Sequence, residues 1–167
     1  MKLVRNTIAV AALAFASSAA FAGPSPQTDD FDVSITLEND CSITFNNINH
    51  GTVTTLATDN DAASAGDNIT CSFADTYSIA LNVGTGGGTY ATRTLANGAN
   101  TLNFNVYSDA GRTTVWGDGS AGAPALVGTS TGGGTPNALT VYSRVVGGQT
   151  GKPEGTYSST ITARATF

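Results

Sequence analysis

The chain has 167 residues, of which only 11% are charged, and its formal net charge is −5. An acidic chain with so few cations repels phosphate groups, which argues against binding to nucleic acid or to an anionic membrane surface. One histidine and two cysteines leave too few ligands and nucleophiles for a metal site or a Cys–His pair, so we expect no enzyme, no metal and no cofactor.

The first 22 residues have the pattern of a secretory signal peptide. Lys2 and Arg5 precede an apolar run from Ile8 to Ala16, and small residues close on Ala20-Phe21-Ala22. The apolar run is too short to span a bilayer, which disfavours a membrane anchor. We therefore expect residues 1–22 to be removed on export and one domain, without an integral membrane segment, to remain.

A short stretch ahead of the first cysteine alternates strictly between apolar and polar residues. Phe31, Val33, Ile35 and Leu37 share one face, which is typical of a strand with one buried side. Prolines and acids precede the stretch, and Glu38–Asp40 follow it with poor strand propensity. The stretch could pair within its own chain as a first strand, or complete a sheet in another molecule.

The two cysteines, Cys41 and Cys71, are expected to form a disulfide, because a lone pair in an exported protein is usually oxidised. Each shares the apolar face of its segment, so both sulfurs should point to the core. Two free buried thiols are the alternative, which the export signal disfavours.

The rest of the chain reads as short strands separated by loops rich in Gly, Asn and Thr. No helical period is convincing after residue 23, so an antiparallel sandwich of immunoglobulin-like type is expected. If this sandwich lacks its last strand, one groove and one edge stay open, and such an edge is normally blocked. The clearest alternating segments are 68–73, 76–83, 101–109, 138–146 and 156–167.

Residues 65–84, 101–120 and 138–167 resemble the spore coat protein U domain, whose best-understood members are subunits of archaic (Csu-type) chaperone–usher pili. The resemblance implies an all-β, incomplete immunoglobulin-like sandwich that a donor strand from another chain completes. A periplasmic chaperone lends this strand first, and the N-terminal extension of the next subunit replaces it at the outer-membrane usher. The implied divisions are a signal peptide (1–22), a donor-strand extension (23–38) and a domain (39–167).

The resemblance also implies roles for particular residues. Phe31, Val33, Ile35 and Leu37 would be the donor residues, and the C-terminal strand with Ile161, Ala163, Ala165 and Phe167 would contact the chaperone. The expected product is a homopolymeric surface fibre of a Gram-negative bacterium, serving adhesion and biofilm formation. Without room for a receptor-binding domain, a repeating rod subunit is favoured.

Other interpretations use other residues. Trp116 and Tyr107 could form a carbohydrate platform, which would make the chain a sugar-binding sandwich or a secreted coat component that does not polymerise. His50 stands beside Gly51 and suits a turn. Asp59 and Asp61 have calcium-loop spacing, but the glycine and glutamate that such a loop requires are missing.

Overall fold

The computed structural model describes residue 23 and residues 26–167, and the expected signal peptide, residues 1–22, lies outside them. The chain divides into two units, Met1–Thr36 and Leu37–Phe167, which are taken separately. All strands lie in the second unit, and the described residues contain no helix. No helix that could cross a membrane therefore occurs among them.

The second unit is built from strands of four to eight residues. In chain order these are β1 (Cys41–Thr44), β2 (Asn60–Ala63), β3 (Asp67–Cys71), β4 (Thr76–Leu81), β5 (Arg93–Asn97), β6 (Asn100–Tyr107), β7 (Leu126–Thr129), β8 (Pro136–Leu139), β9 (Tyr142–Val145) and β10 (Ala163–Thr166).

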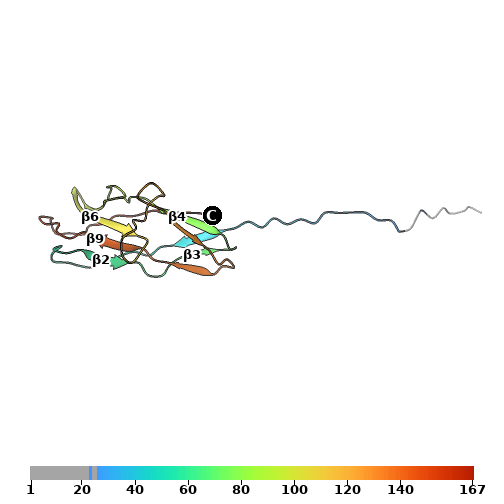
Figure 1. The fold of residues 1–167 in the computed structure, drawn as a ribbon, viewed down its shortest axis with the longest axis horizontal. Coiled ribbons are helices and arrows are strands. Elements are labelled where there is room, and N and C mark those ends of the chain that lie inside the picture. The colour runs from blue at the N-terminus through green and yellow to red at the C-terminus, as the bar shows by residue number, and fades with distance from the viewer. Residues whose placement is uncertain (1–22, 24–25) are drawn as a thin grey trace, which may run out of the picture. The chain divides into compact units, whose positions relative to one another are not determined.

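Every strand pair is antiparallel, and the strands form three sheets. Their orders are β1-β3-β8, β10-β4-β7 and β2-β9-β6-β5. Figure 1 shows β2, β9 and β6 side by side, with the C-terminus near β4, to which β10 pairs. The all-β, antiparallel class expected from the sequence is confirmed.

One expected strand, residues 138–146, is instead two strands in different sheets. β8 pairs with β3 and β9 pairs with β6 and β2, and the break falls at Thr140 and Val141. At this corner the N–H of Ser64 donates to the carbonyl of Val141 at 2.9 Å, and the N–H of Val141 donates to Ser64 Oγ at 2.8 Å. Apolar alternation continues through the corner, so periodicity could not reveal the change of sheet.

The core lies where the inward faces of these strands meet. Alternate residues of β3 and β4 are buried, as the period of a strand requires, and Ile69 and Ile79 are fully enclosed. Trp116 is also fully buried and donates its indole N–H to the carbonyl of Ile79 at 2.7 Å. Each such side chain contributes about 1.5–3 kcal/mol by leaving water.

Candidate functional site

β1 and β10 each stand at the end of a sheet, with a neighbour on one side only. In an antiparallel ladder, alternate residues turn both backbone polar groups to the same neighbour. The N–H of Ser72 donates to the carbonyl of Asp40, and the N–H of Asn82 donates to the carbonyl of Thr162. The even-numbered residues of β1 and β10 therefore turn their backbone polar groups to β3 and β4. The odd-numbered residues of β1 and β10 therefore turn their N–H and C=O groups toward the free edges.

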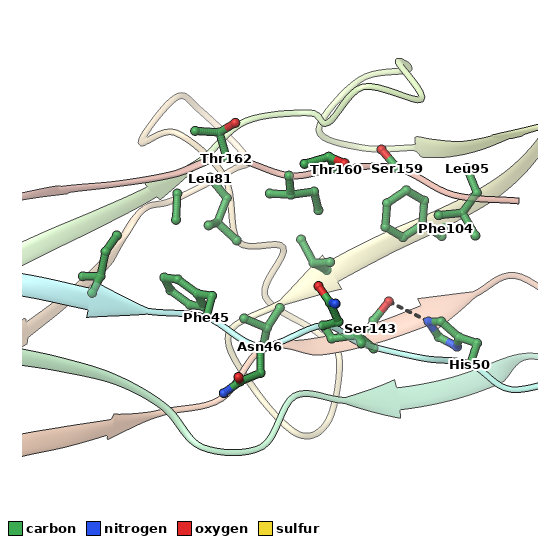
Figure 2. Close-up of a pocket in the computed structure, with 17 residues that line it drawn as sticks. Phe45, Asn46, His50, Leu81, Leu95, Phe104, Ser143, Ser159, Thr160 and Thr162 are labelled. Atoms are coloured by element: carbon green, nitrogen blue, oxygen red, sulfur yellow. Dashed lines mark hydrogen bonds between the residues drawn. The ribbon is translucent and has the colours of Figure 1, made fainter.

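A groove of about 590 Å³ runs between these two strands and the residues that flank them. One wall is residues 43–50 and the other is residues 159–163. From left to right in Figure 2, the residue numbers rise from Phe45 to His50 along one wall. Along the other wall they fall from Thr162 to Ser159. The groove thus separates two edges that run antiparallel to each other.

The floor of the groove is apolar. Leu81, Phe104, Val106 and Val141 line it and belong to the buried core. The apolar residues of the walls, Ile43, Phe45, Ile48, Ile161 and Ala163, are only partly buried. A trough with an apolar floor between two edges of unpaired backbone groups has the chemistry that accepts an extended strand.

A hydrogen-bonded histidine lies at one end of the groove. His50 Nδ1 is 3.1 Å from Asn60 Oδ1, and Nε2 is 2.9 Å from Ser143 Oγ (Figure 2). The amide of Asn60 also donates to the carbonyl of His50 at 3.2 Å. The expected turn beside Gly51 is thus also a point where the wall is fastened to β2 and β9.

A buried carboxylate holds the middle of the same wall. Asp67 is 1% exposed and accepts hydrogen bonds from the hydroxyl of Ser64 and from the N–H of Asn46 at 2.9 Å. Asn46 belongs to the wall, whereas Ser64 belongs to the corner between β2 and β3. Asp67 therefore connects the wall to the turn between β2 and β3. No sequence motif predicts this contact.

One other buried group bonds to residues that neighbour the floor residues in the chain. Arg93 is fully buried and donates to the carbonyls of Asn82 and Trp116 and, through Nη1 at 2.5 Å, to Asn105 Oδ1. Its guanidinium also stands 5.2 Å from the centre of the Tyr90 ring. Burial lowers the pKa of Arg93, the charge of Asp118 opposes this shift, and the hydrogen bonds hold the guanidinium in place.

A second hollow of about 1010 Å³ adjoins the groove, with which it shares Ile48, His50, Leu95 and Ser159. Residues 48–56 and 149–159 form much of its lining. The groove is therefore one part of a longer depression on the second unit.

Asp59 and Asp61, the acidic residues with calcium-loop spacing, form ion pairs with arginines. Arg144 Nε is 2.7 Å from Asp61 and 3.3 Å from Asp59, and Arg112 Nε is 3.3 Å from Asp61. The hydrogen bond from Arg144 keeps the pKa of Asp61 below its ordinary value. Within residues 26–167 no group of three or more His, Cys, Asp or Glu residues is placed to hold a metal ion.

The expected donor residues are exposed. Phe31, Val33 and Ile35 are 85–86% exposed and Leu37 is 68% exposed. Residues 27–40 belong to none of the strands within the described part of the chain. Their role as a donor strand stays a prediction.

The residues expected to meet the chaperone lie on β10 and beside it. Ile161, Ala163 and Ala165 face the core and are half-buried, and Phe167 is 51% exposed. Ile161 and Ala163 also line the groove. Their contact with a chaperone stays a prediction.

Cys41 and Cys71 form the expected disulfide and lie directly opposite each other in the β1–β3 ladder. The suggested carbohydrate platform is not present on the surface, because Trp116 is fully buried and Tyr107 is only partly exposed.

Comparison with known proteins adds the family. The Spore Coat Protein U domain matches residues 27–164. The chain belongs to the spore coat protein U domain family. The resemblance seen in the sequence is thus confirmed, and with it the expectation of a structural protein that is not an enzyme. No curated protein matches the chain.

A solved structure shows the same fold as this spore coat protein U domain. It is a chain in the crystal structure of the CsuC–CsuE chaperone–tip adhesion subunit pre-assembly complex, from archaic chaperone–usher Csu pili of Acinetobacter baumannii. The TM-score is 0.54 at 20% identity, and the match covers 79% of this chain and 40% of that one. The similar region is thus less than half of that chain.

Proposed function

We propose that the protein is a structural subunit of a chaperone–usher pilus, polymerised by donor-strand complementation. The observation that carries the proposal is the apolar groove between the free edges of β1 and β10. The chain also carries the strand-like segment Phe31–Leu37, with four exposed apolar side chains on one face. Membership of the spore coat protein U domain family supports the combination.

The segment and the groove suit each other energetically. An inserted strand gains main-chain hydrogen bonds on both sides, and its alternate side chains cover the apolar floor. Four apolar side chains contribute roughly 6–12 kcal/mol before the cost of ordering the segment. Donation from one subunit to the next is a heterologous contact that does not close on itself, so it builds a fibre.

We also infer a periplasmic chaperone and an outer-membrane usher as partners, which places the fibre on the surface of a Gram-negative bacterium. The similar fold in a chaperone–subunit complex supports this. The chaperone would hold the edge that carries Ile161, Ala163, Ala165 and Phe167.

A tag added after Phe167 is then expected to impair the binding of the chaperone to this edge. Unchanged secretion and assembly of the tagged chain would refute this contact.

The polymer is tested on denaturing gels of protein recovered from the cell surface, unheated and boiled. Strand-exchanged fibres unfold very slowly, so the unheated sample should give a ladder that collapses on boiling. Deletion of Gly23–Glu38 should abolish the ladder. A ladder that survives the deletion would disprove the donor role of this segment.

A matched pair of variants separates the donor face from general damage to the segment. Val33→Asp with Ile35→Asp places two charges on the apolar face, where burial without a partner is costly, and the ladder should disappear. Ser34→Asp with Thr36→Asp places the same charges on the opposite face, and the ladder should remain. Equal loss in both variants would contradict the assignment of the faces.

A further inference from the structure

We propose that the donor strand enters the groove antiparallel to β10 in one register, which pairs Asp32 of the incoming chain with Arg164 of the receiving chain. This inference rests on the proposed function and names its contact residues.

The free edge of β10 and its preceding residues offers four backbone positions. Ser158 exchanges hydrogen bonds with Ala96, the N–H and carbonyl of Thr160 bond to Thr85, and those of Thr162 bond to Asn82. The ladder to β4 continues this phase through Thr166. The N–H and C=O groups that turn away from β4 and β5, toward the groove, are those of Ser159, Ile161, Ala163 and Ala165.

The length of this edge favours one orientation of the incoming strand. The free edge on this side runs over residues 159–165, whereas the regular free edge of β1 covers only Cys41–Thr44. Antiparallel pairing is slightly more stable per residue than parallel pairing. A strand that pairs mainly with the longer edge therefore runs antiparallel to β10, and parallel to β1, since the two walls run in opposite directions (Figure 2).

This orientation requires a second molecule. Inserted in its own groove, the segment would place Leu37 at the His50 end of the wall, while Cys41 lies at the other end. Residues 43–50 span roughly 23 Å when extended, but the link from Leu37 to Cys41 reaches at most about 14 Å. The chain is too short to fill its own groove in this direction.

The register follows from matching four apolar residues to four free backbone positions. Phe31 then lies opposite Ala165, Val33 opposite Ala163, Ile35 opposite Ile161 and Leu37 opposite Ser159. The small side chains of β10 leave room for the large Phe31 at one end.

In this register a charged residue of each strand lies between the pairs Phe31–Ala165 and Val33–Ala163. Asp32 lies directly opposite Arg164, at a position without backbone bonds between the two strands, where side chains approach most closely. Arg164 is exposed and forms no ion pair in the described part of its own chain, unlike Arg112 and Arg144. Asp32 is likewise exposed.

The ion pair supplies information that the apolar pattern lacks. A shift of two residues keeps every apolar side chain on the inner face, so alternation alone does not fix the register. A shift in one direction brings Ser34 opposite Arg164 and loses the pair. A shift in the other brings Asp30 there, but moves Leu37 past the free edge to Tyr157.

The register is tested by mixing, during assembly, two variants that each carry one added cysteine besides the Cys41–Cys71 pair. Residues 34 and 162 are opposite in the proposed register, at a spacing that suits a disulfide. Ser34→Cys mixed with Thr162→Cys should therefore give a covalent dimer after boiling without reductant. Ser34→Cys mixed with Thr160→Cys reports the register shifted by two and should give none.

The ion pair is tested by exchanging its charges. Asp32→Lys and Arg164→Asp should each shorten the lifetime of the unheated ladder in detergent roughly two- to five-fold, and the double variant should restore it. Failure of the double variant to restore the lifetime would refute the pair.

The outcomes separate this inference from the function on which it rests. A dimer with Thr160→Cys alone, or a ladder without a dimer from either mixture, refutes the register. The absence of any ladder from the unmodified chain refutes the proposed function, and the register with it.

Discussion

At the scale of single residues, Arg93 is a buried cation that takes part in none of the ion pairs within the described part of the chain. Carbonyl oxygens of Asn82 and Trp116 and the amide oxygen of Asn105 accept its hydrogen bonds instead. These acceptors come from three separate segments, and two of them are chain neighbours of the floor residues Leu81, Phe104 and Val106.

Replacement of Arg93 by Met should therefore be severely destabilising. The change removes the donor to the buried carbonyl of Trp116, at about 1–3 kcal/mol, and the hydrogen bonds to the carbonyl of Asn82 and to Asn105 Oδ1, so the free energy of unfolding should fall by about 3 kcal/mol. Chemical denaturation of the chain without residues 23–38 measures this. Arg164→Met, the same change at an exposed position, should stay within about 0.5 kcal/mol of the parent, and an equal loss in both variants would contradict the role of Arg93.

Asp61 makes stability depend on pH in a defined direction. Because Arg144 lowers its pKa in the folded state, Asp61 stabilises the fold above its unfolded pKa of about 3.9. That contribution is lost as the pH falls through the lower folded value. Asp61→Asn should thus be less stable than the parent near neutral pH, and the difference should shrink in strong acid. A difference that does not change with pH would contradict this.

Residues such as Asp67, Arg93 and His50 mark the limit of sequence reasoning. The apolar donor face and the cysteine pair are visible because their signals are local spacing or a count. The partners of Asp67, Arg93 and His50 depend instead on which strands lie together. His50 suggested only a turn, although Asn60 and Ser143 make it part of the groove wall.

At the scale of elements, three strands have signals too weak to be predicted from the alternation of apolar residues. β2 has the sequence Asn-Asp-Ala-Ala, β5 has the sequence Arg-Thr-Leu-Ala-Asn, and β7 contains Gly128 and an exposed Val127. All three are edge strands of their sheets, where pairing to one strong neighbour suffices. Segments with clear alternation, by contrast, became β3, β4 and β6, whose alternating apolar residues are buried.

The disulfide between β1 and β3 should be a main source of stability for the groove wall. It closes a loop with a sequence separation of 30 residues, which corresponds to roughly 3–4 kcal/mol. Cys41→Ser with Cys71→Ser should lower the free energy of unfolding by about this amount, measured by thermal or chemical denaturation. Reductant should destabilise the parent but not the variant, and a variant as stable as the parent would refute the contribution.

At the scale of the whole molecule, the groove is assembled from segments far apart in the chain. Its walls come from residues 43–50 and 159–163, and its floor from four further segments. No pattern within a single segment of the sequence predicts such a site. The sequence predicted that a groove should exist, from the isolated strand signal and the family resemblance, but not which residues line it.

Moving the donor segment to the other end of the chain should produce a closed monomer. With residues 23–38 deleted and residues 30–38 appended after Phe167 through a short Gly/Ser linker, the segment can turn back antiparallel to β10. We expect a monomer by size-exclusion chromatography, with a melting temperature above that of the deleted chain. The same fusion with Val33→Asp and Ile35→Asp is the control, and no gain over it would argue against the fit.

The position of the disulfide has a mechanical consequence. In a fibre joined by donor strands, a pulling force enters each subunit through Asp40, next to Cys41. The bond to Cys71 carries that load directly into β3, whose residues Ile69 and Cys71 lie in the core. The force therefore does not separate β1 from β3 one hydrogen bond at a time. In a reduced fibre the same force would peel β1 away and widen the groove, so its tensile strength would depend on the oxidation state of one bond.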